Sequence, residues 1–201
     1  MKKNTKVQRL LALVERHGVL HTRDLKPLGV PRQYLRRLSD QGLLVRTGRG
    51  IYVAPGAGDT VHLGLAQVAK AIPHAVICLL SALQFHEIGT QSPREVWLAL
   101  DRRAARPAIT YPPVRIMRFS GKALTEGVQQ RKVGGVCVSV YDPAKTVADC
   151  FKYRNKIGLD VALEALRNVR RKRLCSNDEL WTYAKVCRVA EVMRPYMEAI
   201  G

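Results

Sequence analysis

The stretch GVPRQYLRRLSDQGLLVRTGRGIYV, residues 29–53, decides the fold of the first quarter of this 201-residue chain. It begins with a Gly and Pro break and continues as a predicted helix over 31–41, in which Leu35 and Leu38 share the buried side. Two β-prone runs with a turn between them that contains two glycines then predict a hairpin over 43–53. The stretch therefore encodes a helix followed by a small β-wing.

The residues before this stretch predict two further helices. Apolar residues recur at helical spacing from Val7 to Val14, and Gly18 provides a stop. A short helix over 25–28 follows, with Thr22 as its expected cap. Two helices, a Gly-containing turn, a third helix and a hairpin make up a winged helix-turn-helix.

The exposed face of the third helix carries the side chains that are predicted to recognise DNA. A helix fits the major groove, where Arg pairs with guanine and Gln with adenine, so Arg32 and Gln33 are predicted to read bases. Arg36 and Arg37, one turn later, are predicted to contact phosphates. The wing and the first helix complete the predicted DNA-binding set with Arg46, Thr47, Arg49, Lys6 and Arg9.

The charge of the chain agrees with a polyanionic partner. The sequence holds 34 Lys and Arg against 16 Asp and Glu, a formal net charge of +18. Residues 1–56 contain 12 basic and 3 acidic residues, so this short segment carries a net charge of +9, half of the total. Such an excess opposes compaction and is typical of nucleic-acid-binding proteins, although a ribosome-associated protein is also basic.

A Pro and Gly run over 54–59 reads as a linker and predicts two domains, 1–56 and 57–201. The second is expected to be α+β, with a small mixed sheet and a helical C-terminal half. Its predicted strands are 95–100, 114–119 and 136–140, and its predicted helices are 61–71, 75–86, 143–153, 159–169, 177–187 and 189–200.

The motifs of the common catalytic and metal sites are missing from the sequence. It contains no phosphate-binding loop, no G-x-S-x-G elbow and no C-x-x-C pair, and the five cysteines and five histidines lack zinc-site spacing. Asp142 and Asp149 can be a metal-binding pair, but a helix cap and a surface ion-pair partner are the commoner roles. We therefore expect no catalytic residue, no metal and no cofactor.

A second basic cluster ends the helix over 159–169. Two interpretations stay open: dipole complementation at a helix C-terminus, and a second contact to DNA or RNA, in which Arg102, Arg103 and Arg106 could take part. The cluster consists of Arg167, Arg170, Arg171, Lys172 and Arg173.

Several segments in the second domain resemble the AbiEi-type antitoxins of bacterial type IV toxin–antitoxin, or abortive infection, systems. After the winged helix come CLLSAL (78–83), PREVWLAL (93–100) and YDPAKTVADCFKYRNKIG (141–158). The likeness extends over essentially the whole chain. One departure is Lys145, at a position where the family pattern Pro-x-Arg-Thr has Arg.

The resemblance implies an autoregulating antitoxin in phage defence. The winged helix would bind inverted repeats of operator DNA and repress its own operon, with possible self-association on the DNA. The C-terminal domain would counteract a nucleotidyltransferase-like toxin without a stable complex. The alternatives are a nucleic-acid-processing enzyme that docks through its winged helix, and a scaffold that binds its toxin directly.

The longest apolar stretch is far too short for a spanning helix, and no signal-peptide cleavage site follows the basic N-terminus. We therefore expect a soluble cytoplasmic protein with no membrane partner.

Overall fold

A computed structural model describes residues 3–56, 61–133 and 135–199, except the side chains of 3–6, 17 and 61. The chain divides into two compact units. The first comprises residues 1–74 with 106–113 and 130–138, and the second comprises the rest. The predicted boundary at 56/57 borders on residues outside the described part and stays a prediction.

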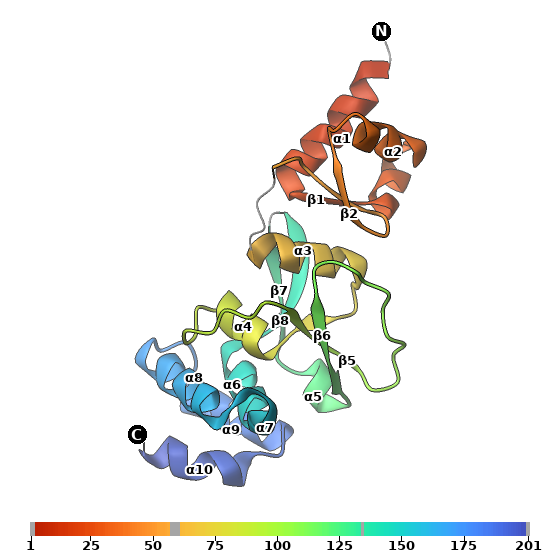
Figure 1. Ribbon diagram of the computed structural model, residues 1–201. Helices are drawn as coiled ribbons and strands as arrows, with labels where there is room; N and C mark the ends of the chain where they lie inside the picture. Colours follow the sequence, from red (N-terminus) through yellow and green to blue (C-terminus); the bar gives the residue numbers. More distant parts are fainter. Residues whose placement is uncertain (1–2, 57–60, 134, 200–201) are drawn as a thin grey trace. The chain divides into compact units, whose positions relative to one another are not determined.

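The first unit begins with helices that surround a three-stranded sheet of order β1-β3-β2 (Figure 1). Both strand pairs are antiparallel. The elements are α1 (Lys3–His17), β1 (Val19–His21), the 3-10 helix η1 (Thr22–Leu28), α2 (Gln33–Asp40), β2 (Val45–Gly48), β3 (Ile51–Val53) and α3 (Val61–Ala71). This order is consistent with the predicted winged helix.

Leucines on the inner faces of the helices form the core of the first unit. Leu10, Leu35 and Leu38 are at most 2% exposed and pack with Leu25 and Leu44. The helical spacing of these residues therefore positions α1, η1 and α2 around one apolar centre, as the sequence predicts.

Two local predictions in the first unit differ from the structure. The cap of η1 is His21, whose side chain accepts a hydrogen bond from the backbone N–H of Arg23, and not Thr22. The strand β1 was not predicted, because three residues are too few to show an alternating pattern.

The second unit holds most of a five-stranded mixed sheet of order β6-β5-β4-β8-β7. β5 pairs with β6 in parallel and with β4 antiparallel, while β4 and β8 are parallel. The strands and their intervening helices are β4 (Val76–Ile77), α4 (Leu79–Phe85), β5 (Val96–Asp101), β6 (Val114–Phe119), α5 (Lys122–Thr125), β7 (Val128–Val133) and β8 (Val136–Tyr141).

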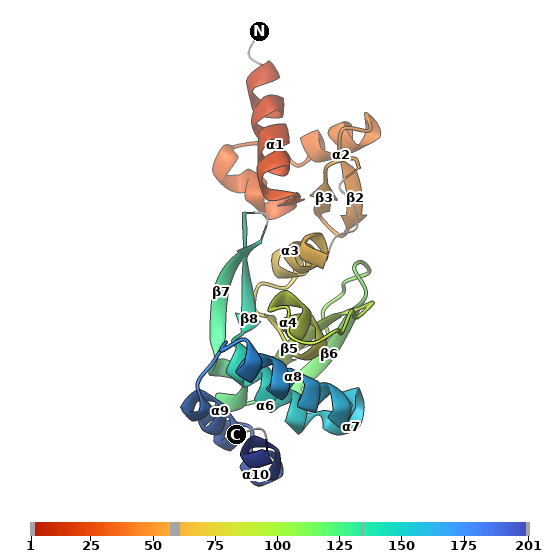
Figure 2. The ribbon, with the colours of Figure 1, turned by 90° about the vertical axis from the view of Figure 1, so that its left-hand side faces the viewer.

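A helical half follows the sheet, as predicted. Its central helix α6 packs against both α8 and α9 (Figure 2). Tyr141 and Phe151 are fully buried and belong to the core that joins these helices to the sheet. The helices are α6 (Pro143–Lys152), α7 (Arg154–Ile157), α8 (Leu159–Arg171), α9 (Asn177–Val186) and α10 (Ala190–Ala199).

The predicted single helix over 75–86 is wrong in its first part. Val76 and Ile77 form β4, and α4 begins only at Leu79. A fully buried apolar run has no periodicity that would separate a strand from a helix. β7 was not predicted either, since its sequence VQQRKV is mostly polar.

Candidate nucleic-acid interface

The helix α2 has one apolar and one cationic face. Leu35 and Leu38 are buried, whereas the four residues predicted to contact DNA are all exposed. At about 100° per residue, positions 32, 33, 36 and 37 lie on one side of a helix. The structure thus presents Arg32, Gln33, Arg36 and Arg37 together to solvent.

The turn before α2 fixes where this face begins. Gly29 adopts a left-handed conformation, φ 59°, and its N–H donates to the carbonyls of Leu25 and Lys26. The N–H of Val30 also donates to the Leu25 carbonyl at 3.3 Å. These bonds close η1 and redirect the chain into α2. The turn needs a left-handed backbone conformation at residue 29, which Gly adopts more readily than other residues.

The wing is a short hairpin in which β2 has a bulge between Arg46 and Gly48. Of its two glycines only Gly50 has a positive φ, 75°. A Cβ atom at Gly50 would lie 2.8 Å from the Thr22 hydroxyl oxygen, and the Gly50 carbonyl accepts a hydrogen bond from the Thr22 N–H at 2.9 Å. Gly50 therefore allows both the turn and its close packing on η1.

The three predicted wing residues lie in different environments. Arg49 is exposed at the turn, and Arg46 is exposed but donates through Nε to the Gly48 carbonyl at 3.2 Å. Thr47 is half-buried, and its hydroxyl oxygen is inaccessible and has no hydrogen-bond partner among the described residues. The arginines can reach a polyanion, whereas the Thr47 hydroxyl cannot do so in this conformation.

The predicted residues on α1 are described only in part. Arg9 is exposed. Lys6 belongs to α1, but its side chain lies outside the described residues.

A polar cluster that the sequence analysis missed joins η1 to α3. The Lys70 ammonium forms an ion pair with Asp24 at 2.7 Å. The backbone carbonyl of Lys70 accepts a hydrogen bond from the Arg23 guanidinium at 3.0 Å. His21 Nδ1 accepts hydrogen bonds from the N–H and Nε of Arg23, and burial together with the Arg23 charge lowers the pKa of His21. The His-x-x-Asp spacing of this capping box was the available signal.

The second basic cluster is partly occupied by structural contacts. Arg170 donates to the Met197 carbonyl at 3.0 Å, and Lys172 donates to the Glu87 carbonyl at 2.6 Å. Arg171 donates to the Asn168 side chain, while Arg167 and Arg173 are exposed. The bonds of Arg170 and Lys172 tie part of the cluster to other segments of the second unit and leave both interpretations of the cluster open.

The two acidic residues weighed as a metal pair serve the fold instead. Asp142 caps α6 by accepting the N–H of Lys145 at 2.8 Å. Asp149 forms an ion pair with Lys145 at 2.6 Å, and both side chains are at most 1% exposed. The cap was predicted correctly, but the ion pair is buried rather than on the surface.

Burial dominates the electrostatics of this pair. It raises the pKa of Asp149 to about 6, against the opposing effect of Lys145 and of the Cys187 thiol, whose sulfur lies 3.2 Å from Oδ1. The Lys145 ammonium also lies 4.0 Å from the centroid of the Tyr141 ring. It also lies 5.1 Å from the centroid of the Phe119 ring, so Lys145, the departure from the family pattern, is a buried cation held by one carboxylate and two aromatic rings.

Within the described ranges, no three potential ligand side chains gather as a metal site would require. Nor does any helix in those ranges have the length and apolar character needed to cross a membrane.

A match to a known protein family falls within the first unit. Residues 8–55 match the family described as transcriptional regulator, AbiEi antitoxin. No curated protein sequence matches the chain. The fold is similar to the crystal structure of the RV2827C protein from Mycobacterium tuberculosis, with a TM-score of 0.58 and 15% identity, over 90% of this chain and 71% of that one.

Proposed function

The chain carries an AbiEi-type transcriptional-regulator domain at residues 8–55, and from this premise we propose that it is a DNA-binding autorepressor. In this proposal residues 1–56 of the first unit form a winged helix-turn-helix that binds inverted repeats in the operator of its own operon. The domain boundary falls near residue 57.

One observation carries the proposal: a single exposed face of α2 holds three arginines and one glutamine above a buried leucine pair. Arg32 and Gln33 begin the helix, where side chains of a docked recognition helix reach base edges. Arg36 and Arg37 follow one turn later and neutralise phosphates. Specificity and affinity thus come from different turns of one helix.

The wing extends the same surface. Arg49 and Arg46 contact the DNA backbone or the minor groove beside the site, and Arg9 adds long-range attraction. Thr47 lies within the bulge of the wing, and its hydroxyl oxygen is inaccessible in this conformation.

The C-terminal unit is proposed to be the antitoxin part of a type IV system. It counteracts a nucleotidyltransferase-like toxin without forming a stable complex. The family match at the N-terminus supports a toxin–antitoxin regulator. The structural roles of Asp142 and Asp149 do not favour the alternative of a metal-dependent nuclease.

Binding to the region upstream of its own gene tests the repressor proposal. The purified protein is expected to shift this duplex at concentrations at which a scrambled duplex of equal length stays free. A reporter under the same promoter should lose expression when the protein is supplied. Equal affinity for both duplexes, or an unaffected reporter, would contradict the proposal.

The toxin partnership is tested separately. Co-expression with the neighbouring toxin is expected to restore growth, while affinity purification of either protein fails to recover the other. Recovery of a stable complex would favour the scaffold alternative.

A further inference from the structure

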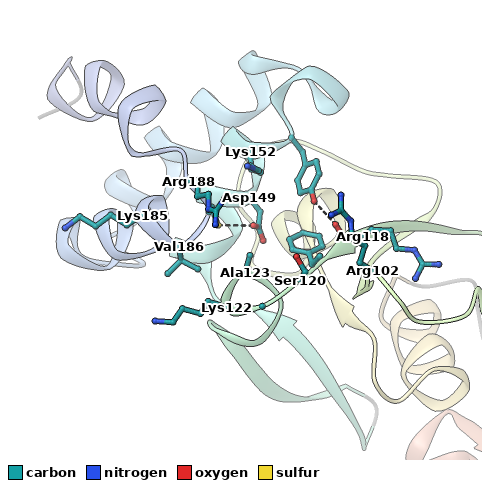
Figure 3. Close-up of a pocket in the computed structure, with 14 residues that line it drawn as sticks. Arg102, Arg118, Ser120, Lys122, Ala123, Asp149, Lys152, Lys185, Val186 and Arg188 are labelled. Carbon is teal, nitrogen blue, oxygen red and sulfur yellow. Dashed lines mark hydrogen bonds between the residues drawn. The ribbon is translucent and has the colours of Figure 1, made fainter.

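The second unit contains a pocket of about 700 Å³ whose lining is strongly cationic (Figure 3). This volume lies within the range of about 300–1,000 Å³ of small-ligand sites. The lining comes from the loop after β5, the end of β6, α5, α6 and the end of α9, and Asp149 is its one acidic residue. Its basic residues are Arg102, Arg118, Lys122, Lys152, Lys185 and Arg188.

Most of this positive charge is not neutralised by the protein. Arg102, Lys152 and Arg188 are exposed, and their side chains form no hydrogen bond or ion pair with the described residues. Asp149 is already paired with Lys145, which is buried beside it. The pocket therefore presents a net positive field to a ligand, and such a concentration of like charge opposes folding unless an anion binds there.

Arg118 is held in place for recognition. Its Nη1 donates to the carbonyls of Asp101 and Ala104, both at 2.8 Å, and its own carbonyl accepts the Tyr153 hydroxyl at 3.1 Å. A guanidinium has five donors, so others stay available on a side chain whose orientation is fixed. A planar fork held in this way suits bidentate contact with phosphate oxygens.

Arg188 reaches the pocket from a backbone position that favours glycine. It follows α9 with a φ of 58°, and the flanking Val189 N–H donates back to the Ala184 carbonyl at 2.8 Å. This is a helix C-terminal turn, where Gly is the residue with the lowest backbone strain. Arg188 lines the pocket (Figure 3), so the strained position supplies a cation to the site.

We propose that this pocket binds a small free molecule with two or more phosphate groups, of the class of nucleoside di- and triphosphates. Arg118 provides the oriented fork, and Arg102, Lys152 and Arg188 provide the charge. The two rings of Phe119 and Tyr153, with centroids 5.3 Å apart, form an apolar wall for the remainder of the ligand. This site is separate from the DNA-binding surface proposed for α2.

Calorimetric titration of the full chain tests the proposal, with ATP, GTP and inorganic tripolyphosphate as probes and sulfate as the control with a single anionic group. Binding of tripolyphosphate alone would assign recognition to the phosphates, and tighter binding of ATP or GTP would add a contribution from the nucleoside. Either result supports the site. Absence of binding of all three probes at millimolar concentration, or sulfate binding as tightly as tripolyphosphate, would overturn it.

Variants locate the binding to the pocket. Arg102→Ala is expected to weaken the binding of the probe at least tenfold, since it removes a charge-assisted hydrogen bond to a phosphate oxygen. The matched control is Arg103→Ala, which removes the neighbouring exposed cation that does not line the pocket. Equal losses in the two variants would show a diffuse charge effect and overturn the proposal.

Arg188→Gly separates binding from folding. Glycine relieves the positive φ, so the variant is expected to melt no lower than the wild type while losing at least tenfold in probe affinity. Its affinity for operator DNA should stay unchanged, which makes the outcome independent of the repressor proposal. Unchanged probe affinity in a folded Arg188→Gly protein would contradict the site.

Discussion

Lys145 and Asp149 form a buried ion pair in the interior of the second unit. They lie one helical turn apart on α6, and each is almost wholly removed from solvent. Removing one partner of such a pair leaves a buried charge without its counter-ion, whereas replacing both with apolar groups is often tolerated.

Asp149→Ala is therefore expected to lower the free energy of unfolding by about 3–5 kcal/mol, because the buried Lys145 ammonium would lose both its counter-ion and the oxygen to which it donates a hydrogen bond. A protonated Asp149 loses its charge but keeps that oxygen, so protonation does not have the effect of the alanine substitution. Urea denaturation followed by circular dichroism measures this loss. The double variant Lys145→Met with Asp149→Leu should recover much of the stability.

Glu191→Ala is the control for this pair. It breaks an exposed ion pair in which Glu191 Oε1 lies 2.8 Å from Arg194 Nη2. The variant should change stability by less than about 1 kcal/mol. If the two single variants lose the same amount, burial is not what makes the Lys145–Asp149 pair important.

The same pair predicts a pH dependence. Burial raises the pKa of Asp149 from 3.8 to about 6, so the folded protein holds a proton that the unfolded chain releases. This contribution to stability is fully present below the unfolded pKa and is lost as the pH rises through about 6.

Unfolding free energies measured between pH 5 and pH 8 show whether stability falls, as predicted, when the pH rises. The wild type should lose more stability over this rise in pH than Asp149→Asn does, because the amide does not titrate. Parallel pH profiles for the two proteins would show that Asp149 does not contribute this effect.

At the scale of elements, the sequence was most informative where periodicity was strong. Helical spacing directly predicts that Leu35 and Leu38 are buried and that the arginines between them are exposed. The strands β1 and β4 were missed because two or three buried residues leave no pattern, and β7 because polar residues occupy most of it.

Gly50→Ala tests the element on which the wing depends. A Cβ atom at this positive φ would strain the turn and approach the Thr22 hydroxyl, so we expect a loss of about 1–2 kcal/mol in the stability of the first unit, together with weaker DNA binding. Thermal unfolding and a DNA titration measure the two effects.

Gly42→Ala is the matched control for steric approach. Its φ of 71° is nearly that of Gly50, but nothing lies within 4 Å of the added Cβ. It should show the backbone strain without the clash. A Gly42→Ala protein as unstable as Gly50→Ala would mean that packing on Thr22 does not hold the wing.

At the scale of the molecule, the sequence predicted a charge excess but not where all of it gathers. The cations of the pocket in the second unit come from separate segments between Arg102 and Arg188, so no local motif joins them. The burial of Lys145 could not be predicted from the sequence either. Its four-residue spacing from Asp149, which is typical of an ion pair on a helix, is visible in the sequence.

The salt dependence of DNA binding reports on the first unit as a whole. If each monomer neutralises about six phosphates, the logarithm of the binding constant should fall against the logarithm of salt with a slope of about −5 per monomer. Fluorescence anisotropy across a salt series measures it. A slope near zero would exclude the backbone contacts proposed for α2 and the wing.

On an inverted repeat, two copies of the chain would place their α2 helices about 34 Å apart, one turn of DNA. Changing the spacing between half-sites by half a turn should therefore abolish any cooperative binding. Binding that is insensitive to the spacing would contradict a paired arrangement.

The most direct test of the central claim compares the affinity for operator and scrambled DNA in three variants. Arg32→Ala and Gln33→Ala should each lower the ratio of the two affinities, because a bidentate pair with a base provides about 1–3 kcal/mol of discrimination. Arg49→Ala should weaken both duplexes alike and leave the ratio unchanged. If Arg32→Ala weakens both duplexes equally, α2 does not read the sequence and the account is wrong.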